Sequence, residues 1–465
     1  MINRWIPFLC LLALPSSTLS KKVLYDNWKL YRFYPCNAGE MSLLLDLHES
    51  NLNIIFLQDL NRHMMNMQEQ FMSVDILLSP NYLMSDTFKT LKDKIESHVL
   101  AENVQKLIDE EAKHIVESGS SLNWDSYGSI GLINQFLGQM AAKYTHVDLL
   151  DMGVSAEKGI PLKVLKISSS DSHGKIWISG GLHGRDWISS AVVTYVINEL
   201  LTSKDVDVNN ISEFYDLYFL PVMNPDGYDY SQKTDRMWKK TRASTNSNIG
   251  CVGADANRNW DDDSKLDDTF PNPCNNTYPG DKGFSENEVV DASEFYMNHV
   301  ANDTNMFLTV HGYNQLILLP YGRSGGRFKT EDAFDEWVGV AKKAARSMSG
   351  HLPRKVEKIL LPHEQFRIGN ISDIMGERHG SAVDWVTKQN SKIELALEIG
   401  LNNLSRGIFV PADQIKQKGI EFMKGLKELV IYFNGKTTTG DGDSPQCLPV
   451  EQTIKPSLYC FAGNK

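Results

Sequence analysis

"KIWISGGLHGRDWISSAVVTYVINELL", residues 175–201, contains the pattern that decides the fold. Its first part, 175–181, is typical of a buried strand, and its last part, 190–201, is typical of an apolar helix. Between them, glycines lead into His183 and Asp186, so the connecting turn carries ionisable side chains. The stretch predicts a strand–turn–helix unit with a candidate functional site at the turn.

The alternation of strands and helices continues along the chain from about residue 120. Strand-like segments lie at 162–168, 215–224, 305–313 and 392–400, and helical segments lie at 133–140 and 334–349. Long apolar strands that alternate with helices are typical of a sheet buried on both faces. We expect an α/β domain over residues 116–435, with a mixed, largely parallel sheet and helices on both faces.

A smaller unit precedes this domain. Strand-like segments lie at 22–35, 52–60 and 73–79, one helix carries Phe88, Leu91 and Ile95, and another is expected over 101–117, with Val104, Leu107, Ile108, Ala112 and Ile115 on one face. The polar stretch 117–126 fits a linker. We expect a small α+β domain over residues 21–115, and a polar C-terminal tail over 436–465 held by a disulfide.

Residues 1–20 have the features of a secretory signal peptide. Arg4 precedes the apolar run 5–15, and small residues follow up to Ser20. The run is shorter than the roughly 20 residues of a membrane-spanning helix. A buried N-terminal strand is the alternative. We expect a secreted, extracellular protein that is not inserted in a membrane.

The charge balance narrows the class of partner. The chain has 47 Lys and Arg against 58 Asp and Glu, a net charge of −11, and no basic block. This composition does not favour nucleic acid or an anionic membrane as the main partner. The chain also has no Gly-rich phosphate loop, which argues against a phosphate-binding α/β protein.

Cysteine usage agrees with an oxidising compartment. Cys10 leaves with the signal peptide. Cys251 and Cys274 lie in one loop-rich region, Cys447 and Cys460 lie in the polar tail, and Cys36 is left over. Two short-range disulfides would suit such a chain. Glycosylation sequons begin at Asn210, Asn275, Asn302, Asn370 and Asn403.

Three of the strand ends carry candidate metal-site residues. His183 and Asp186 are spaced by three, which brings both side chains to one side of a helical turn. Alone, the pair is weak evidence, because an Asp at a helix start is often only a cap. His311 ends another strand, at the edge where sites gather in open α/β sheets. Glu398, also near a strand end, could act as general base beside a metal-bound water.

A second group of residues suits an anionic substrate end. Asn257 and Arg258 are adjacent, and Arg185 lies within the opening stretch. Because the guanidinium fork binds carboxylates in bidentate fashion, these residues could hold a carboxylate. Taken alone, the sequence "NRN" is only typical of a turn.

The sequence resembles the secreted zinc metallocarboxypeptidases of the pancreatic carboxypeptidase A/B type, zymogen region included. The matching motifs are "GGLHGRDWIS", "LPVMNPDGYDYSQKTDRMWKKTRA", "CVGADANRNWD", "TVHGYNQLILLPYG", "GSAVDW" and "ALEIGLNNLSRGIFVPADQI". They follow the family's order over roughly 120–435, and 21–115 matches the prosegment more weakly. The resemblance implies a monomeric zymogen in which the prosegment acts as an intramolecular inhibitor.

The resemblance also implies the role of each site residue. His183, Asp186 and His311 fall on the positions that bind one zinc ion, and Glu398 falls on the general base. Asn257 and Arg258 fall on the residues that hold the substrate carboxylate, and Arg185 and Tyr313 fall on substrate subsites. Cys251 and Cys274 match the family's disulfide. Carboxypeptidase A is itself a well-known case of a zinc site with two His and one Glu, so this ligand set comes from the family. The implied reaction removes C-terminal residues from peptides or proteins.

Three residues depart from the family pattern. Asp186 replaces the zinc-binding Glu and is shorter by one methylene. Lys239 replaces the Arg that polarises the substrate carbonyl, keeping the charge but losing the planar fork. Gly376 stands where the family has a mobile Tyr that closes over the substrate. An attenuated or inactive enzyme would show this pattern.

Specificity and activation follow from two further positions. By resemblance, Val383 occupies the specificity position, and an apolar side chain there implies apolar or aromatic C-terminal residues. Lys113 is the expected site of a trypsin-like activating cut. Two functions stay open: a zinc carboxypeptidase zymogen, which the retained residues favour, and an inactive carboxypeptidase-like protein that binds peptide C-termini or a partner.

Overall fold

The computed structural model describes residues 21–48, 53–60, 73–245, 250–261, 272–323, 326, 328, 330–349, 366–390, 393–401 and 406–438. Within these ranges, no helix is both long enough and apolar enough to cross a membrane.

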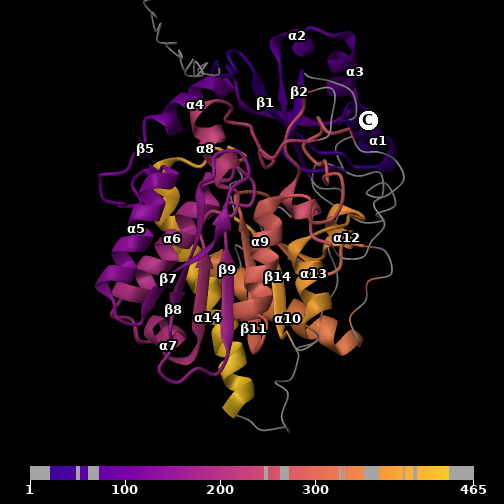
Figure 1. Cartoon of the computed structure of the whole chain (residues 1–465). Coiled ribbons are helices and arrows are strands. Elements are labelled where there is room, and N and C mark those ends of the chain that lie inside the picture. The colour runs from indigo at the N-terminus through magenta and orange to yellow at the C-terminus, as the bar shows by residue number, and fades with distance from the viewer. Residues whose placement is uncertain are drawn as a thin grey trace, which may run out of the picture.

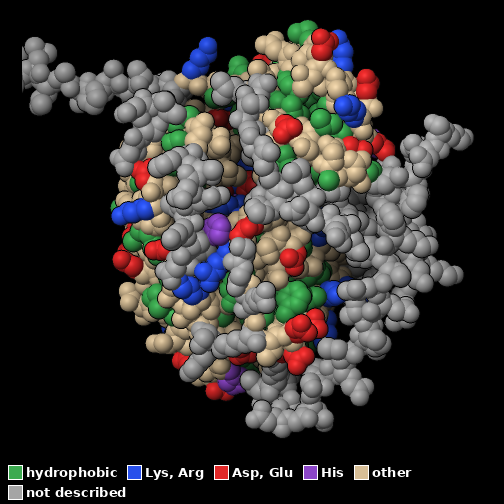
Figure 2. Space-filling model, turned by 90° about the vertical axis from the view of Figure 1, so that its right-hand side faces the viewer, with side chains coloured by type: hydrophobic (Ala, Val, Ile, Leu, Met, Phe, Trp, Pro, Cys, Tyr) green, Lys and Arg blue, Asp and Glu red, His purple; other side chains and the backbone are tan. Residues whose placement is uncertain are grey.

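On the face shown in Figure 2, acidic and basic side chains of the described residues are interspersed over the surface.

An eight-stranded mixed sheet forms the centre of the larger domain (Figure 1). Its strands are β7 (Val147–Val154), β8 (Pro161–Ile167), β9 (Lys175–Ser179), β10 (Asp216–Leu220), β11 (Thr304–His311), β12 (Leu316–Leu319), β13 (Arg367–Asn370) and β14 (Leu395–Gly400). The strand order is β13-β12-β14-β11-β9-β10-β8-β7. The central strands β14, β11, β9 and β10 are parallel, whereas β12 pairs with β14, and β8 with both its neighbours, in antiparallel fashion. The expected mixed sheet is confirmed.

Helices cover both faces of this sheet. The helices of the larger domain are α5 (Ile130–Lys143), α6 (Trp187–Thr202), α7 (Val206–Phe214), α8 (Pro225–Lys233), α9 (Asn287–Phe295), the π-helix η3 (Tyr296–Val300), α10 (Glu331–Met348), α12 (Ile371–Met375), α13 (Ala382–Gln389) and α14 (Ile415–Thr438). α14 packs against both α6 and α10, and α6 contacts β9, β10 and β11. From the opposite face of β9, Trp177 contacts the rings of Phe295 and Tyr296. The central strands are therefore buried on both faces, which explains their continuous apolar sequences.

The N-terminal domain has its own four-stranded antiparallel sheet, in the order β2-β3-β1-β4. Its elements are β1 (Lys29–Phe33), α1 (Ala38–His48), β2 (Ile54–Phe56), β3 (Val74–Leu78), α2 (Pro80–Leu83), α3 (Asp86–Lys94), β4 (Ser97–Ala101) and α4 (Val104–Ala112). In Figure 1 this domain, in indigo, lies across one end of the large sheet. The expected α+β domain ahead of the α/β domain is confirmed.

The interface between the two domains has an apolar part and a charged part. Its apolar cluster includes Leu30, Leu57 and Leu77 from the N-terminal domain and Tyr313, Ile408 and Phe409 from the larger domain. Beside it, Glu111 of α4 accepts a hydrogen bond from Arg236 Nε at 2.8 Å, and both side chains are buried. The Arg236 guanidinium lies 3.9 Å from the ring centroid of Trp187. The N-terminal domain therefore lies over the segment 175–201, which contains Trp187.

Two expected boundaries are corrected. α4 ends at Ala112, and Ile115 lies in the short strand β5 (Ile115–Val116), which pairs with β6 (Tyr127–Gly128). Helical spacing predicted that Ile115 lies on the helix face. In the structure it pairs instead with Tyr127 of β6, on the far side of the linker. α14 extends to Thr438, past the expected start of the tail at 436.

The cysteines also correct one expectation. Cys36 is disulfide-bonded rather than left over. Cys447 and Cys460 lie outside the described residues, so the tail disulfide stays a prediction. Cys251 and Cys274 form the disulfide that the family resemblance implies, with a Cα–Cα distance of 5.2 Å.

Candidate active site

Residues 180–186 form a tight turn that joins β9 to α6. β9 ends at Ser179, so His183 lies in the turn rather than at the strand end. The Asp186 N–H donates to the His183 carbonyl at 3.0 Å, closing the turn. Asp186 occupies the N-cap position of α6, but its side chain makes no capping hydrogen bond. Its carboxylate instead lies 3.6 Å from His183 Nδ1, so capping does not account for this Asp.

His311, at the end of β11, completes a group of three metal-ligand side chains. One ligand atom each from His183, Asp186 and His311 lies within 4.8 Å of the others. Zinc–ligand distances of about 2.1 Å at tetrahedral angles put ligand atoms roughly 3.4 Å apart. The 3.6 Å between His183 and Asp186 matches this spacing. The shorter Asp side chain therefore reaches the position that a metal ligand requires.

Gly312 allows the shorter Asp186 side chain to be held in place. The Gly312 N–H donates to Asp186 Oδ2 at 3.1 Å. A Cβ atom on Gly312 would lie 3.1 Å from Asp186 Cβ, so a larger residue would push the two segments apart. The close approach of β11 to the turn thus depends on this glycine.

Asp255 orients His183 from the side away from the metal position. Asp255 Oδ1 lies 3.0 Å from His183 Nε2, which leaves Nδ1 facing Asp186. A carboxylate on the second ring nitrogen is the usual support of a metal-binding His. Burial would lower the pKa of His183, yet the Asp255 carboxylate raises it above its ordinary value. Asp255 was not predicted, although its position two residues before Asn257 was a usable signal.

The ionisation of the other two candidate ligands suits a cation. Burial would raise the pKa of Asp186, but hydrogen bonding to His183 and its charge lower it below its ordinary value. Burial lowers the pKa of His311, which favours the neutral imidazole. Metal binding requires an ionised carboxylate and neutral imidazoles. All three side chains therefore fit a zinc ion in geometry, and the ionisation of Asp186 and His311 also suits it.

Glu398 lies beside this group on β14. The parallel register of β11 and β14 places it next to Thr309, and its Oε2 is 4.0 Å from His311 Nε2. Its Oε1 accepts a hydrogen bond from Asn257 Nδ2 at 3.0 Å. A carboxylate held in this way can accept a proton from a water molecule at the metal position.

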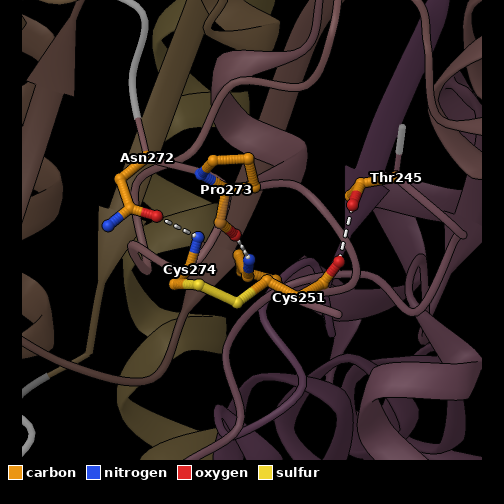
Figure 3. The surroundings of a disulfide bond; sticks show 6 residues. Thr245, Cys251, Asn272, Pro273 and Cys274 are labelled. Atoms are coloured by element: carbon orange, nitrogen blue, oxygen red, sulfur yellow. Dashed lines mark hydrogen bonds between the residues drawn. A yellow bond between two sulfur atoms is a disulfide. The ribbon is translucent and has the colours of Figure 1, made fainter. Parts of the chain in front are cut away.

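A disulfide-anchored loop carries Asp255, Asn257 and Arg258. Figure 3 shows the Cys251–Cys274 bond beside two local hydrogen bonds, from Thr245 Oγ1 to the Cys251 carbonyl and from the Cys274 N–H to Asn272 Oδ1. At the turn η2 (Ala256–Arg258), Asp255 Oδ1 accepts the Asn257 N–H at 3.0 Å. The loop is thus fixed at both ends, which positions the side chains that face the site.

Lys239 is a buried cation between two carboxylates. Its ammonium lies 2.7 Å from Asp59 Oδ1 and 2.8 Å from Asp255 Oδ2, and the side chain is 2% exposed. The Lys239 carbonyl accepts the Gly184 N–H, which ties this segment to the turn of His183. Lys239 is the residue expected to polarise the substrate carbonyl, but Asp59 of the N-terminal domain engages its ammonium group.

Asp59 also engages the residues expected to hold the substrate carboxylate. Arg258 Nη2 donates to Asp59 Oδ2 at 2.9 Å, and Arg378 Nη1 lies 3.9 Å from the same oxygen. Burial would raise the pKa of Asp59, but Lys239 and Arg258 lower it well below its ordinary value. The N-terminal domain therefore inserts an ionised carboxylate among the cations of the site.

The expected subsite residues are covered by the same domain. Arg185 Nη2 donates to the Leu57 carbonyl at 2.9 Å. The Tyr313 hydroxyl donates to Asp75 and accepts a hydrogen bond from Gln58 at 2.8 Å. Backbone and side-chain groups of the N-terminal domain therefore engage the hydrogen-bonding groups of the residues expected to contact a substrate.

One cavity brings together nearly all of the predicted site residues. It is lined by His183, Arg185, Asp186, Lys239, Asn257, Arg258, His311, Tyr313 and Glu398, together with Asp59 and Arg378, which the sequence did not predict. Val383 differs, because it is fully buried in α13 and does not line this cavity. Gly376 ends α12 at a φ of 76°, a conformation that favours glycine.

Comparisons with known proteins agree with this geometry. Residues 133–425 match the family model of zinc carboxypeptidases, and residues 31–111 match that of the carboxypeptidase activation peptide. Zinc carboxypeptidase A 1 of Anopheles gambiae is 30% identical over 432 residues, covering 92% of this chain and 94% of that protein. Carboxypeptidase A2 of Rattus norvegicus is 31% identical over 344 residues, covering 72% of this chain and 78% of that protein.

Solved structures show the same fold. The crystal structure of carboxypeptidase A from Helicoverpa armigera superposes with a TM-score of 0.72 at 21% identity, covering 89% of this chain and 99% of the other. Thrombin activatable fibrinolysis inhibitor gives the same TM-score at 24% identity, covering 89% and 100%. The chain belongs to the zinc carboxypeptidase family and includes a carboxypeptidase activation peptide.

Proposed function

We propose that the protein is a secreted zymogen that, once processed, removes the C-terminal residue from peptides with the help of one zinc ion. The observation that carries this proposal is the convergence of His183, Asp186 and His311 beside Glu398. When bound there, zinc supplies Lewis-acid activation of water and of the scissile carbonyl. Secretion rests on the signal-like residues 1–20. Among the sequon asparagines that the structure describes, Asn302 is the exposed one and is the proposed glycosylation site.

The remaining steps belong to side chains of the protein. Glu398 accepts a proton from the attacking water and transfers it to the leaving nitrogen. Lys239 stabilises the negative charge that develops on the carbonyl oxygen. Asn257 and Arg258 bind the terminal carboxylate and so restrict hydrolysis to the last peptide bond. Arg185 and Tyr313 contact residues further from the C-terminus.

Asp59 is the proposed inhibitory residue of the activation peptide. It pairs with Lys239 and Arg258, the two cations that the reaction needs free. The matched activation peptide supports an intramolecular inhibitor spanning 21–115, with cleavage after Lys113, which is exposed just beyond α4. Val383 predicts that apolar or aromatic C-terminal residues are accepted.

The test uses the full chain treated with trypsin, with bound zinc and release of C-terminal Phe from a blocked peptide as readouts. We expect one zinc per chain and release of Phe that a chelator abolishes. A processed protein that binds no zinc and releases no residue would favour the alternative, a protein that only binds peptide C-termini. Asp186→Glu is the matched variant, since recovery of zinc and activity would locate the defect at this ligand.

A further inference from the structure

Arg378 is a buried cation in the candidate active site, and the proposed reaction gives it no role. It lies in the loop between α12 and α13, and its side chain is 10% exposed. It lines the same cavity as Arg258, Asn257 and Glu398. Among the described residues, the one carboxylate within 4.0 Å of its guanidinium is that of Asp59, which belongs to the activation peptide.

The loop holds the Arg378 side chain in a fixed direction. Its Nη2 donates to the Met375 carbonyl at 2.6 Å, and its N–H donates to the Gly322 carbonyl at 2.8 Å. Gly380 brings the loop against the backbone of Arg258, since a Cβ at Gly380 would lie 2.2 Å from the Arg258 carbonyl oxygen. The loop of Arg378 therefore lies against the backbone of Arg258, and both guanidinium groups lie within 4.0 Å of the same Asp59 oxygen.

The contacts of Asp59 indicate what this pair of guanidinium groups can bind. The Asp59 carboxylate accepts a hydrogen bond from Arg258 Nη2, and the Asp59 backbone carbonyl accepts one from Arg378 Nη2 at 3.2 Å. One residue thus presents two acceptors, a side-chain carboxylate and a main-chain oxygen, to two cations. A C-terminal residue with an acidic side chain presents two corresponding groups, a side-chain carboxylate and a main-chain carboxylate. Both of these groups are negatively charged.

Processing removes the carboxylate that partly balances Arg378. Burial and the neighbouring Arg258 lower the pKa of Arg378 to about 10, which reflects an unfavourable environment for a second cation. With Asp59 gone, Lys239 keeps Asp255 as partner, whereas Arg258 and Arg378 lose their only carboxylate within 4.0 Å among the described residues. Two guanidinium groups that lack a carboxylate partner attract an anionic ligand group, which gains charge-assisted hydrogen bonds at this position.

We propose that Arg378 is a specificity-determining residue that makes the processed enzyme accept C-terminal Glu and Asp, beyond the apolar residues that Val383 predicts. In this arrangement one guanidinium binds the terminal carboxylate and the other binds the side-chain carboxylate, each through charge-assisted hydrogen bonds. The inference rests on the proposed function and names a substrate class for the same site.

The test compares substrates that differ only in side-chain charge. The full chain is processed with trypsin, and kcat/KM is measured for blocked peptides that end in Glu, Gln or Phe. Since a hydrogen bond to a charged group contributes about 10-fold or more, we expect Glu to exceed Gln by at least that factor. Arg378→Gln should reduce the Glu/Gln ratio to about 1, and Arg378→Lys should give an intermediate ratio because it keeps only the point charge.

Controls separate this inference from the proposed function. Arg346→Gln changes an exposed arginine at the end of α10 and should leave the Glu/Gln ratio unchanged. A wild-type ratio of 1 or below overturns the inference, as does a ratio that Arg378→Gln leaves intact. If Arg378→Gln does not fold, the wild-type ratio and Arg378→Lys decide.

A binding measurement covers the case of an inactive enzyme. If no peptide, Phe included, is hydrolysed by the zinc-loaded protein, the proposed function fails. Calorimetry of the processed protein with N-acetylglutamate and N-acetylglutamine then tests the inference alone. Tighter binding of the glutamate that is lost in Arg378→Gln supports it, and equal binding of the two overturns it.

Discussion

Replacing Asp59 by Asn should weaken the closed state of the zymogen. The substitution keeps the shape of the side chain but removes the charge that faces Lys239 at 2.7 Å and Arg258 at 2.9 Å. Removing one partner of a buried ion pair costs about 3–5 kcal/mol. Because Lys239 keeps Asp255 as a partner, we take the lower end, about 3 kcal/mol. This corresponds to a roughly 100-fold increase in the fraction of molecules with an open site.

Two assays on the uncleaved protein follow this change. Release of Phe without trypsin should rise by roughly 100-fold, in proportion to the open fraction. Cleavage near Lys113 should accelerate as well, which provides a readout that does not need activity. Asp93→Asn, an exposed position on α3 of the same domain, is the matched control. If Asp59→Asn changes neither rate relative to Asp93→Asn, Asp59 does not hold the site closed.

Three further changes have defined outcomes. Asp255→Asn should lower zinc affinity by about 10–100-fold, measured by competition with a chelator, because the ring of His183 loses its orienting carboxylate; unchanged affinity would contradict this role. Gly312→Ala should destabilise the protein by about 1–3 kcal/mol in denaturant unfolding and weaken zinc binding, because its Cβ would crowd Asp186. Burial raises the pKa of Glu288 to about 7, so this residue favours the folded state below about pH 4.5 and loses that contribution as the pH rises towards 7. Glu288→Gln should therefore raise Tm at pH 8 and make little difference at pH 4, and a Tm gain independent of pH would refute the assignment.

Strong local patterns in the sequence were sufficient for most of the fold. The apolar runs that became β9, β10, β11 and β14 are buried on both faces, so each carries a continuous signal that does not depend on its neighbours. The strands β7, β12 and β13 were not predicted, because β7 and β13 are partly exposed and β12 has only four residues. Ile115 was assigned to a helix, since its partner Tyr127 lies across the linker.

The features of the site also divide into those that the sequence predicts and those that only the structure shows. His183, Asp186, His311, Glu398, Asn257 and Arg258 stand in motifs whose residue types already suggest their chemistry, and the structure gathers them around one cavity. Asp186 was a reason to doubt metal binding, because the sequence shows only that its side chain is shorter. The structure shows that β11 approaches closely enough, at Gly312, for this carboxylate to lie 3.6 Å from His183.

The sequence by itself determined the family, the strand–turn–helix unit and most of the candidate site residues, because these depend on local pattern and residue type. Only the tertiary structure decided that Asp59 reaches Lys239 and Arg258, since these residues are far apart in the chain and meet through the docking of two separately folded sheets. It also decided the place of Arg378 beside Arg258, which follows from the close contact of two backbone segments at Gly380. Long-range electrostatic contacts of this kind leave no periodic signal in the sequence, which is why they required the fold.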